Sequence, residues 1–128
     1  MCMGTCPVYH LQVNNDKTIL LFTELVYKDN TLVADTSKMG YFAGIVDNTL
    51  YGKLMNELQI IGLDSLNIDI GSYVDLPEIR IHIYYNGKHK YLKTNSPSDK
   101  ADNLVSILYE ICQTKNLRRT NRKFIIEN

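Results

Sequence analysis

Residues 78–93, EIRIHIYYNGKHKYLK, carry the strongest structural signal in the chain. From Ile79 to Tyr85, apolar residues alternate with residues that tolerate solvent, which is the period of a half-buried strand. Asn86 and Gly87 then favour a two-residue turn of the primed type, in which both central residues need a positive φ. The segment therefore predicts an antiparallel hairpin, which is the local structure that the sequence indicates most clearly.

The turn also predicts which side chains share a face of the hairpin. Counting outward from the turn, the expected pairs are Tyr85–Lys88, Tyr84–His89, Ile83–Lys90, His82–Tyr91 and Ile81–Leu92. Cross-strand partners lie on the same face, so the aliphatic residues are expected to face the core. The opposite face then carries a hairpin patch, defined as Arg80, His82, Tyr84, His89, Tyr91 and Lys93. Exposed strand faces ordinarily carry such residues, and a binding surface is the functional alternative.

Two histidines of the hairpin patch raise the question of a metal. His82 and His89 are expected on diagonal positions, about 7–8 Å apart at the backbone. Two imidazoles at this separation can share a metal ion, but no third ligand is evident. We therefore predict no metal site and no cofactor.

Upstream of the hairpin, the sequence predicts strands over 8–13, 18–27 and 41–46, the first two joined by a polar turn. Asp47 and Asn48 offer N-cap oxygens to a helix that runs through about Ile60, and Gly62 is the expected stop. The buried stripe of this helix is expected to comprise Tyr51, Leu54, Met55 and Leu58.

Downstream of the hairpin, a second amphipathic helix is indicated by Leu104, Ile107, Leu108, Ile111 and Cys112. The tail, 117–128, is basic and then apolar, and is expected to be either an edge strand over 123–126 or a frayed end. The order is ββ(β)-α-ββ-α, without the spacing that parallel crossovers need. The chain is therefore expected to form a single domain, 1–128, of the α+β class. Its two layers would be an antiparallel sheet of four to six strands and two helices packed on one face.

The opening, MCMGTCPVYH, brackets a glycine with two cysteines. A straight strand would hold Cys2 and Cys6 roughly 13 Å apart, beyond the limit of about 7 Å for a disulfide, although Gly4 could bend the chain. The residues favour a structural corner, in which Pro7 leads into the first strand. A disulfide, a reactive dithiol and a metal site with His10 stay open as alternatives.

At this point the sequence resembles a known family. The pattern Cys-x-Gly-x-Cys-Pro-x-Tyr (Cys2, Gly4, Cys6, Pro7 and Tyr9) is similar to the opening of an uncharacterised bacterial family, a domain of unknown function of Bacteroidetes type. The later Asp75 and Pro77, followed by the Asn-Gly-Lys hairpin, resemble the same family. The resemblance implies an envelope location and favours a Cys2–Cys6 bond, but it implies no reaction.

Composition excludes several classes of function. Fourteen basic residues balance 14 acidic ones, so the zero net charge gives no general attraction to nucleic acid. No apolar run is long enough to span a bilayer. The sequence as given predicts a cytoplasmic protein. If an export signal has been removed from it, an envelope or periplasmic location is expected instead.

Catalytic patterns are also missing from the sequence: there is no phosphate-binding glycine loop, zinc-protease helix or nucleophile elbow. We therefore expect no catalytic residues and no enzyme activity. The expected function is a small interaction module that uses the open sheet face or an edge strand to bind a protein, a peptide or a second copy of the chain. The alternative is a thiol-redox or metal-linked protein that works through Cys2, Cys6 and His10.

Overall fold

The structure is a computed structural model that describes residues 7–28, 31–62, 79–94 and 99–127. The described elements are, in chain order, β1 (Val8–Val13), β2 (Thr18–Leu25), the short helix η1 (Thr36–Lys38), β3 (Gly40–Ile45), α1 (Asn48–Ile61), β4 (Ile79–Tyr85), β5 (Lys88–Thr94), α2 (Asp99–Cys112) and β6 (Arg118–Arg119). The expected α+β class and its antiparallel strands are confirmed.

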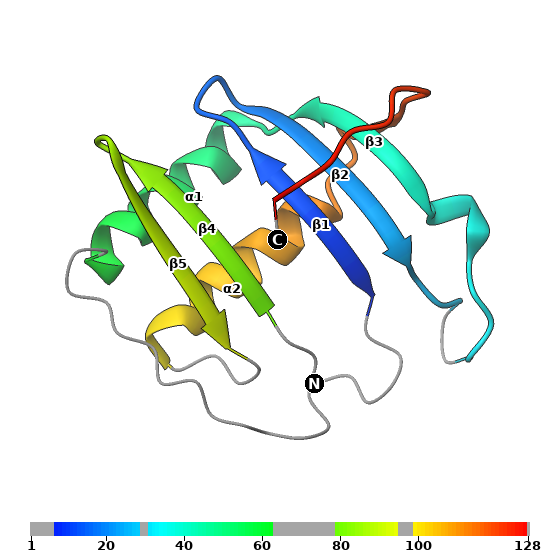
Figure 1. Ribbon diagram of the computed structural model, residues 1–128, viewed down its shortest axis with the longest axis horizontal. Coiled ribbons are helices and arrows are strands. Elements are labelled where there is room, and N and C mark those ends of the chain that lie inside the picture. The colour runs from blue at the N-terminus through cyan, green and yellow to red at the C-terminus, as the bar shows by residue number, and fades with distance from the viewer. Residues whose placement is uncertain (1–6, 29–30, 63–78, 95–98, 128) are drawn as a thin grey trace.

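The strands form two sheets rather than one continuous sheet (Figure 1). The larger has the order β1-β2-β3-β6, and the hairpin of β4 and β5 is a separate two-stranded sheet. Every pair within these sheets is antiparallel. The four strands of the larger sheet lie within the expected range of four to six.

The hairpin has the register that its turn predicts. Tyr84 pairs with His89 and His82 pairs with Tyr91. Asn86 and Gly87 have φ values of 48° and 72°, so both central residues lie in the left-handed region that a primed turn requires. One dipeptide therefore sets which side chains share each face of β4 and β5.

Helix α1 begins and ends where its capping residues indicate. The Asp47 carboxylate accepts a hydrogen bond from the Leu50 amide at 2.7 Å, and Gly62 ends the helix with a φ of 70°. Leu50 and Leu54 are buried. Met55, which we expected in the buried stripe, is 39% exposed. It lies one position beyond Leu54, and the 100° turn per residue carries its side chain away from the sheet.

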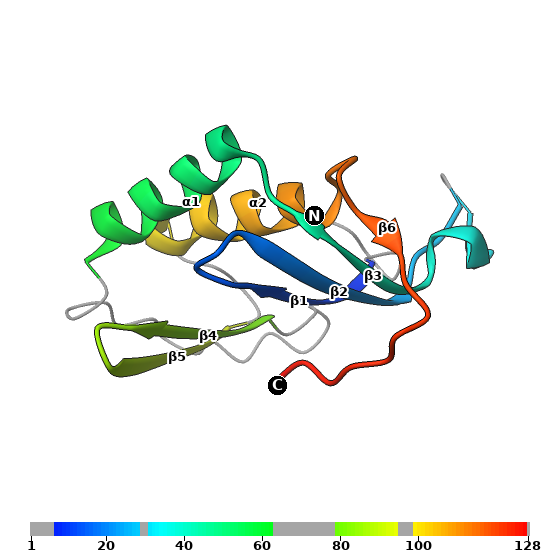
Figure 2. The same cartoon turned by 90° about the horizontal axis from the view of Figure 1, so that it is seen from above.

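Both helices lie on the same side of the strands in Figure 2. The main core fills the space between these layers. It comprises Ile19 from β2, Val46 from the segment before α1, Leu50 and Leu54 from α1, and Leu104 and Ile111 from α2. Ile81 and Ile83 of β4 pack against the same cluster. The side of the strands that faces away from both helices is called the helix-free face below.

The C-terminal tail forms an edge strand, but at other residues than the expected 123–126. The pairing strand is β6, where Arg118 and Arg119 pair with Ala43 and Phe42 of β3, and residues 123–126 form no strand. The Arg119 guanidinium donates to the backbone oxygens of Met39 and Ser37 at 2.7 and 2.8 Å, and these bonds hold the basic part of the tail against β3. The remainder of the tail crosses the helix-free face toward β4 (Figures 1 and 2).

Candidate functional site

The hairpin places the predicted patch residues on neighbouring strands. Arg80, His82 and Tyr84 lie on β4, and β5 supplies their partners Lys93, Tyr91 and His89. Tyr84 is 65% exposed and Tyr91 44% exposed, whereas the His82 side chain is only 16% exposed. The side chain of Lys93 lies outside the described part of the chain.

Four rings of the hairpin patch lie in a row, joined by two stacked contacts and one hydrogen bond. Tyr91 stacks on His82 with ring centroids 4.5 Å apart. The rings of His82 and His89 lie edge to edge, with centroids 5.1 Å apart and a hydrogen bond of 2.9 Å between His82 Nδ1 and His89 Nε2. His89 in turn stacks on Tyr84 at 4.3 Å. Each imidazole therefore contacts one tyrosine ring and the other imidazole.

A carboxylate of the tail, that of Glu127, lies beside this row of rings. The Tyr84 hydroxyl donates to Glu127, with the two carboxylate oxygens at 2.6 and 2.9 Å. Glu127 Oε1 also lies 3.3 Å from Nδ1 of His82. The hydrogen bond to Glu127 raises the pKa of Tyr84, since the carboxylate favours the protonated phenol. Sequence reasoning missed Glu127, because nothing in residues 117–128 indicates where the tail lies.

A second row of rings lies on the larger sheet. His10 of β1 stacks on Phe22 of β2 at 5.5 Å, and Phe22 stacks on Tyr41 of β3 at 4.7 Å. Phe124 of the tail packs edge-on against Tyr41 at 5.0 Å. The tail therefore contacts both sheets, with Phe124 on the larger one and Glu127 on the hairpin.

The charged residues of the hairpin are all basic and are divided between its two faces. Between residues 79 and 94 the chain carries four basic residues, Arg80, Lys88, Lys90 and Lys93, and no aspartate or glutamate. The molecule as a whole is neutral, so this local excess of positive charge is compensated elsewhere in the chain. Arg80 and Lys93 share the face of the hairpin patch, whereas Lys88 and Lys90 pair with Tyr85 and Ile83 on the opposite face.

Three side chains of this surface could hold a metal ion. Nδ1 or Nε2 of His82 and His89 and a carboxylate oxygen of Glu127 all lie within 4.8 Å of one another. Sequence analysis named the two histidines but had no third ligand. Nε2 of His82 is buried and makes no hydrogen bond within the described residues.

The opening signature is only partly described. Cys2, Gly4 and Cys6 lie outside the described residues, as do Asp75 and Pro77, so the disulfide, dithiol and metal alternatives for the cysteines stay predictions. Tyr9 packs edge-on against Tyr109, with ring centroids 6.1 Å apart. Desolvation by burial raises the pKa of Tyr9.

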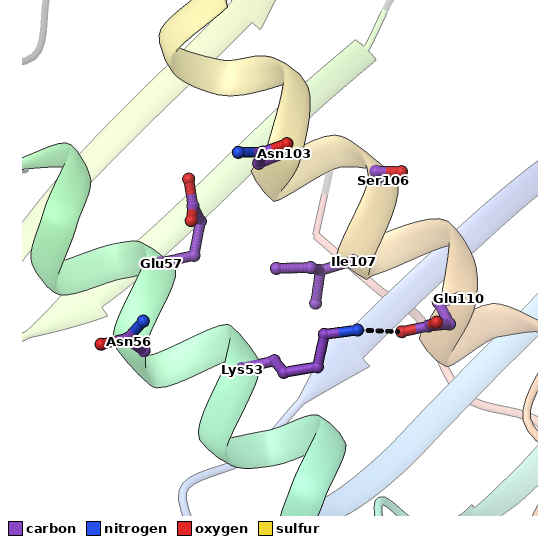
Figure 3. Close-up of a pocket in the computed structure, with 7 residues that line it drawn as sticks. All are labelled: Lys53, Asn56, Glu57, Asn103, Ser106, Ile107 and Glu110. Atoms are coloured by element: carbon purple, nitrogen blue, oxygen red, sulfur yellow. Dashed lines mark hydrogen bonds and ion pairs between the residues drawn. The ribbon is translucent and has the colours of Figure 1, made fainter.

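A polar groove lies between the two helices, on their surface away from the sheet (Figure 3). It is lined by Lys53, Asn56, Glu57, Asn103, Ser106, Ile107 and Glu110. Lys53 donates to Glu110 at 3.3 Å across the groove. Both of these side chains are more than half exposed, so their ion pair adds little stability.

The fold and the patch define the class of protein: a small two-layer α+β domain with an aromatic, basic surface on its helix-free face. Residues 1–114 match a family described as Domain of unknown function (DUF6438), and the chain belongs to this family. The predicted membership of an uncharacterised domain family is thereby confirmed. Neither the curated proteins nor the solved structures contain a match to the chain. Among the described residues, neither helix is long and apolar enough to cross a membrane.

Proposed function

We propose that this protein is a non-catalytic interaction module that binds a protein segment across its helix-free face. The partner segment would carry an aromatic ring and, about three residues later, a carboxylate. The observation that carries this proposal is the position of the chain's own tail, which contacts that face through Phe124 and Glu127.

The chemistry of the face matches such a segment at two points. Tyr41, which stacks on Phe22, contacts an aromatic side chain of the tail edge-on. Further along the tail, the carboxylate of Glu127 accepts a hydrogen bond from the hydroxyl of Tyr84 on β4. Aromatic contacts supply binding energy, while the charge-assisted hydrogen bond sets the register of the segment.

The tail would then act as an internal competitor for the partner. A ligand that uses the same contacts must displace Phe124 and Glu127, so its apparent affinity is reduced by the fraction of molecules with a docked tail. Variants that weaken tail docking should therefore bind the partner more tightly.

A labelled peptide with the sequence of residues 120–128 tests the proposal on the full-length protein. The double variant Phe124→Ala/Glu127→Gln should bind this peptide more tightly than the unmodified protein, as measured by fluorescence anisotropy. Adding Tyr41→Ala and Tyr84→Phe to that variant should abolish binding. The matched control is Ile125→Ala, which alters a side chain that is 97% exposed and should behave like the unmodified protein.

Two outcomes would decide against the proposal: no binding by the double variant, or binding that survives the loss of Tyr41 and Tyr84. Light scattering on the same samples examines self-association. Dimers that disappear on Phe124→Ala/Glu127→Gln would identify a second copy of the chain as the partner that donates the tail.

A further inference from the structure

Three metal-ligand atoms converge between the hairpin and the tail. Nδ1 of His82 lies 2.9 Å from Nε2 of His89 and 3.3 Å from Oε1 of Glu127. The three ligand atoms of the cluster lie within 4.8 Å of one another. Two strands and a tail segment, distant in sequence, thus bring three potential metal-ligand atoms close together.

These separations are close to those of a tetrahedral metal site. Bonds of about 2.0–2.1 Å place tetrahedral ligand atoms about 3.3–3.4 Å apart. The distance from His82 to Glu127 already has this value, and the distance between the imidazole nitrogens must open by only a few tenths of an ångström. The remaining separation, between His89 and Glu127, is at most 4.8 Å, and Glu127 can shorten it because its side chain is about half exposed.

The surroundings hold the ligands in place before a metal arrives. The outer rings of the row, Tyr91 and Tyr84, lie against His82 and His89 respectively. The Tyr84 hydroxyl donates to Glu127 and so orients its carboxylate. Hydrogen bonds of this kind to a ligating group ordinarily raise metal affinity.

The donor set indicates the type of metal. Two neutral imidazoles and a carboxylate suit Zn²⁺ and neighbouring transition metals, whereas Mg²⁺ and Ca²⁺ prefer oxygen ligands alone. In the metal-free protein the facing nitrogens of His82 and His89 share a hydrogen bond. A divalent cation would replace it by accepting a lone pair from each imidazole and one from Glu127, with the proton of each ring on its other nitrogen. Three protein ligands leave the fourth position to water or to a partner group.

We propose that His82, His89 and Glu127 bind one Zn²⁺ ion per chain. The bound ion joins the hairpin to the C-terminal tail and fixes the tail on the helix-free face. This proposal rests on the three side chains alone and holds whether or not the same face binds a partner protein.

Isothermal titration calorimetry with Zn²⁺ tests the site. The full-length protein should carry Cys2→Ser and Cys6→Ser, so that thiolates cannot contribute ligands. We expect one Zn²⁺ per chain in this background. His82→Gln or His89→Gln should weaken binding by more than about 100-fold, since even the loss of an outer hydrogen bond costs about 10–100-fold.

The chain offers a matched control, because its third histidine lies outside the cluster. His10→Gln should leave zinc affinity unchanged. His89 is exposed, so His89→Gln should fold even if a change at the more buried His82 does not. Substituted Co²⁺ should give the intense visible absorption of a four-coordinate site, and Glu127→Gln should alter that spectrum.

Zinc binding that His89→Gln leaves intact, or that His10→Gln removes, would overturn the proposal. So would a stoichiometry well below one ion per chain. Neither result bears on peptide binding by the metal-free protein, so failure of this proposal is distinguishable from failure of the proposed function.

Discussion

The Tyr84 hydroxyl donates to the carboxylate of Glu127, a residue 43 positions further along the chain. This contact ties the tail to the hairpin and places a carboxylate beside two hydrogen-bonded imidazoles. Because the tail also contacts Tyr41 of the larger sheet through Phe124, it connects two sheets that share no strand pairing.

Glu127→Gln should return the pKa of Tyr84 toward the ordinary value for tyrosine. The carboxylate raises this pKa by accepting the phenolic proton and by opposing a second negative charge. Tail docking therefore contributes stability below the ordinary tyrosine pKa of about 10, and this contribution is lost as the pH rises through the raised value. The measurement is an NMR titration of the tyrosine ring carbons.

Tyr9 serves as the internal reference in that titration. Its pKa is raised mainly by burial rather than by Glu127, so it should not move in the variant. A Tyr84 pKa that also stays unchanged would show that the tail does not dock on the hairpin in solution.

Ile111→Ala should destabilise the fold by about 2–5 kcal/mol, because the side chain is fully buried between α2 and the sheet and its removal leaves a cavity. Urea denaturation measures the change. Ile125→Ala removes a similar side chain that is 97% exposed and should stay within about 0.5 kcal/mol. Equal effects of the two substitutions would contradict the assigned core.

Gly44→Ala should destabilise the protein, whereas Gly52→Ala should stabilise it. A Cβ atom at Gly44 would overlap the backbone oxygen of Asn116, where the chain leaving α2 crosses β3. A Cβ at Gly52 meets no atom within 4 Å, and alanine gains about 0.5–1 kcal/mol over glycine inside a helix. Thermal unfolding should therefore shift in opposite directions. Shifts of the same sign would contradict the close approach at β3.

Cys112 should resist alkylation in the native protein at mildly alkaline pH. Burial raises the pKa of its thiol to about 12, so almost no thiolate is present. In the unfolded chain the thiol has an ordinary pKa of about 8.5. The stability that the buried, protonated thiol contributes is therefore lost as the pH rises from about 8.5 toward 12. Peptide mapping after iodoacetamide treatment should find Cys112 modified only with denaturant. Rapid modification without denaturant would place this thiol outside the core.

The hairpin shows how far local chemistry specifies this structure. Asn86 and Gly87 determine the turn, the turn determines the register, and the register determines that His82, Tyr84, His89 and Tyr91 share one face. Asp47 and Gly62 likewise mark the ends of α1. These features were predictable because each depends on residues that are near neighbours in the chain.

The division into two sheets, the row of rings on β1 to β3 and the docking of the tail were not predictable in this way. They depend on contacts between residues far apart in sequence, such as His82 with Glu127 and Arg119 with the backbone of Met39. A basic and then apolar tail contains no periodicity that indicates its partner, which is why an edge strand or a frayed end was expected.

The sequence by itself therefore determined the α+β class, the hairpin register and which side chains share the face of the hairpin patch, since periodicity, caps and turn residues act over a few positions. Only the tertiary structure decided that Glu127 completes a three-ligand cluster and that Phe124 lies on Tyr41. Burial and close packing select those contacts, and they act on the whole folded chain rather than on any segment of it.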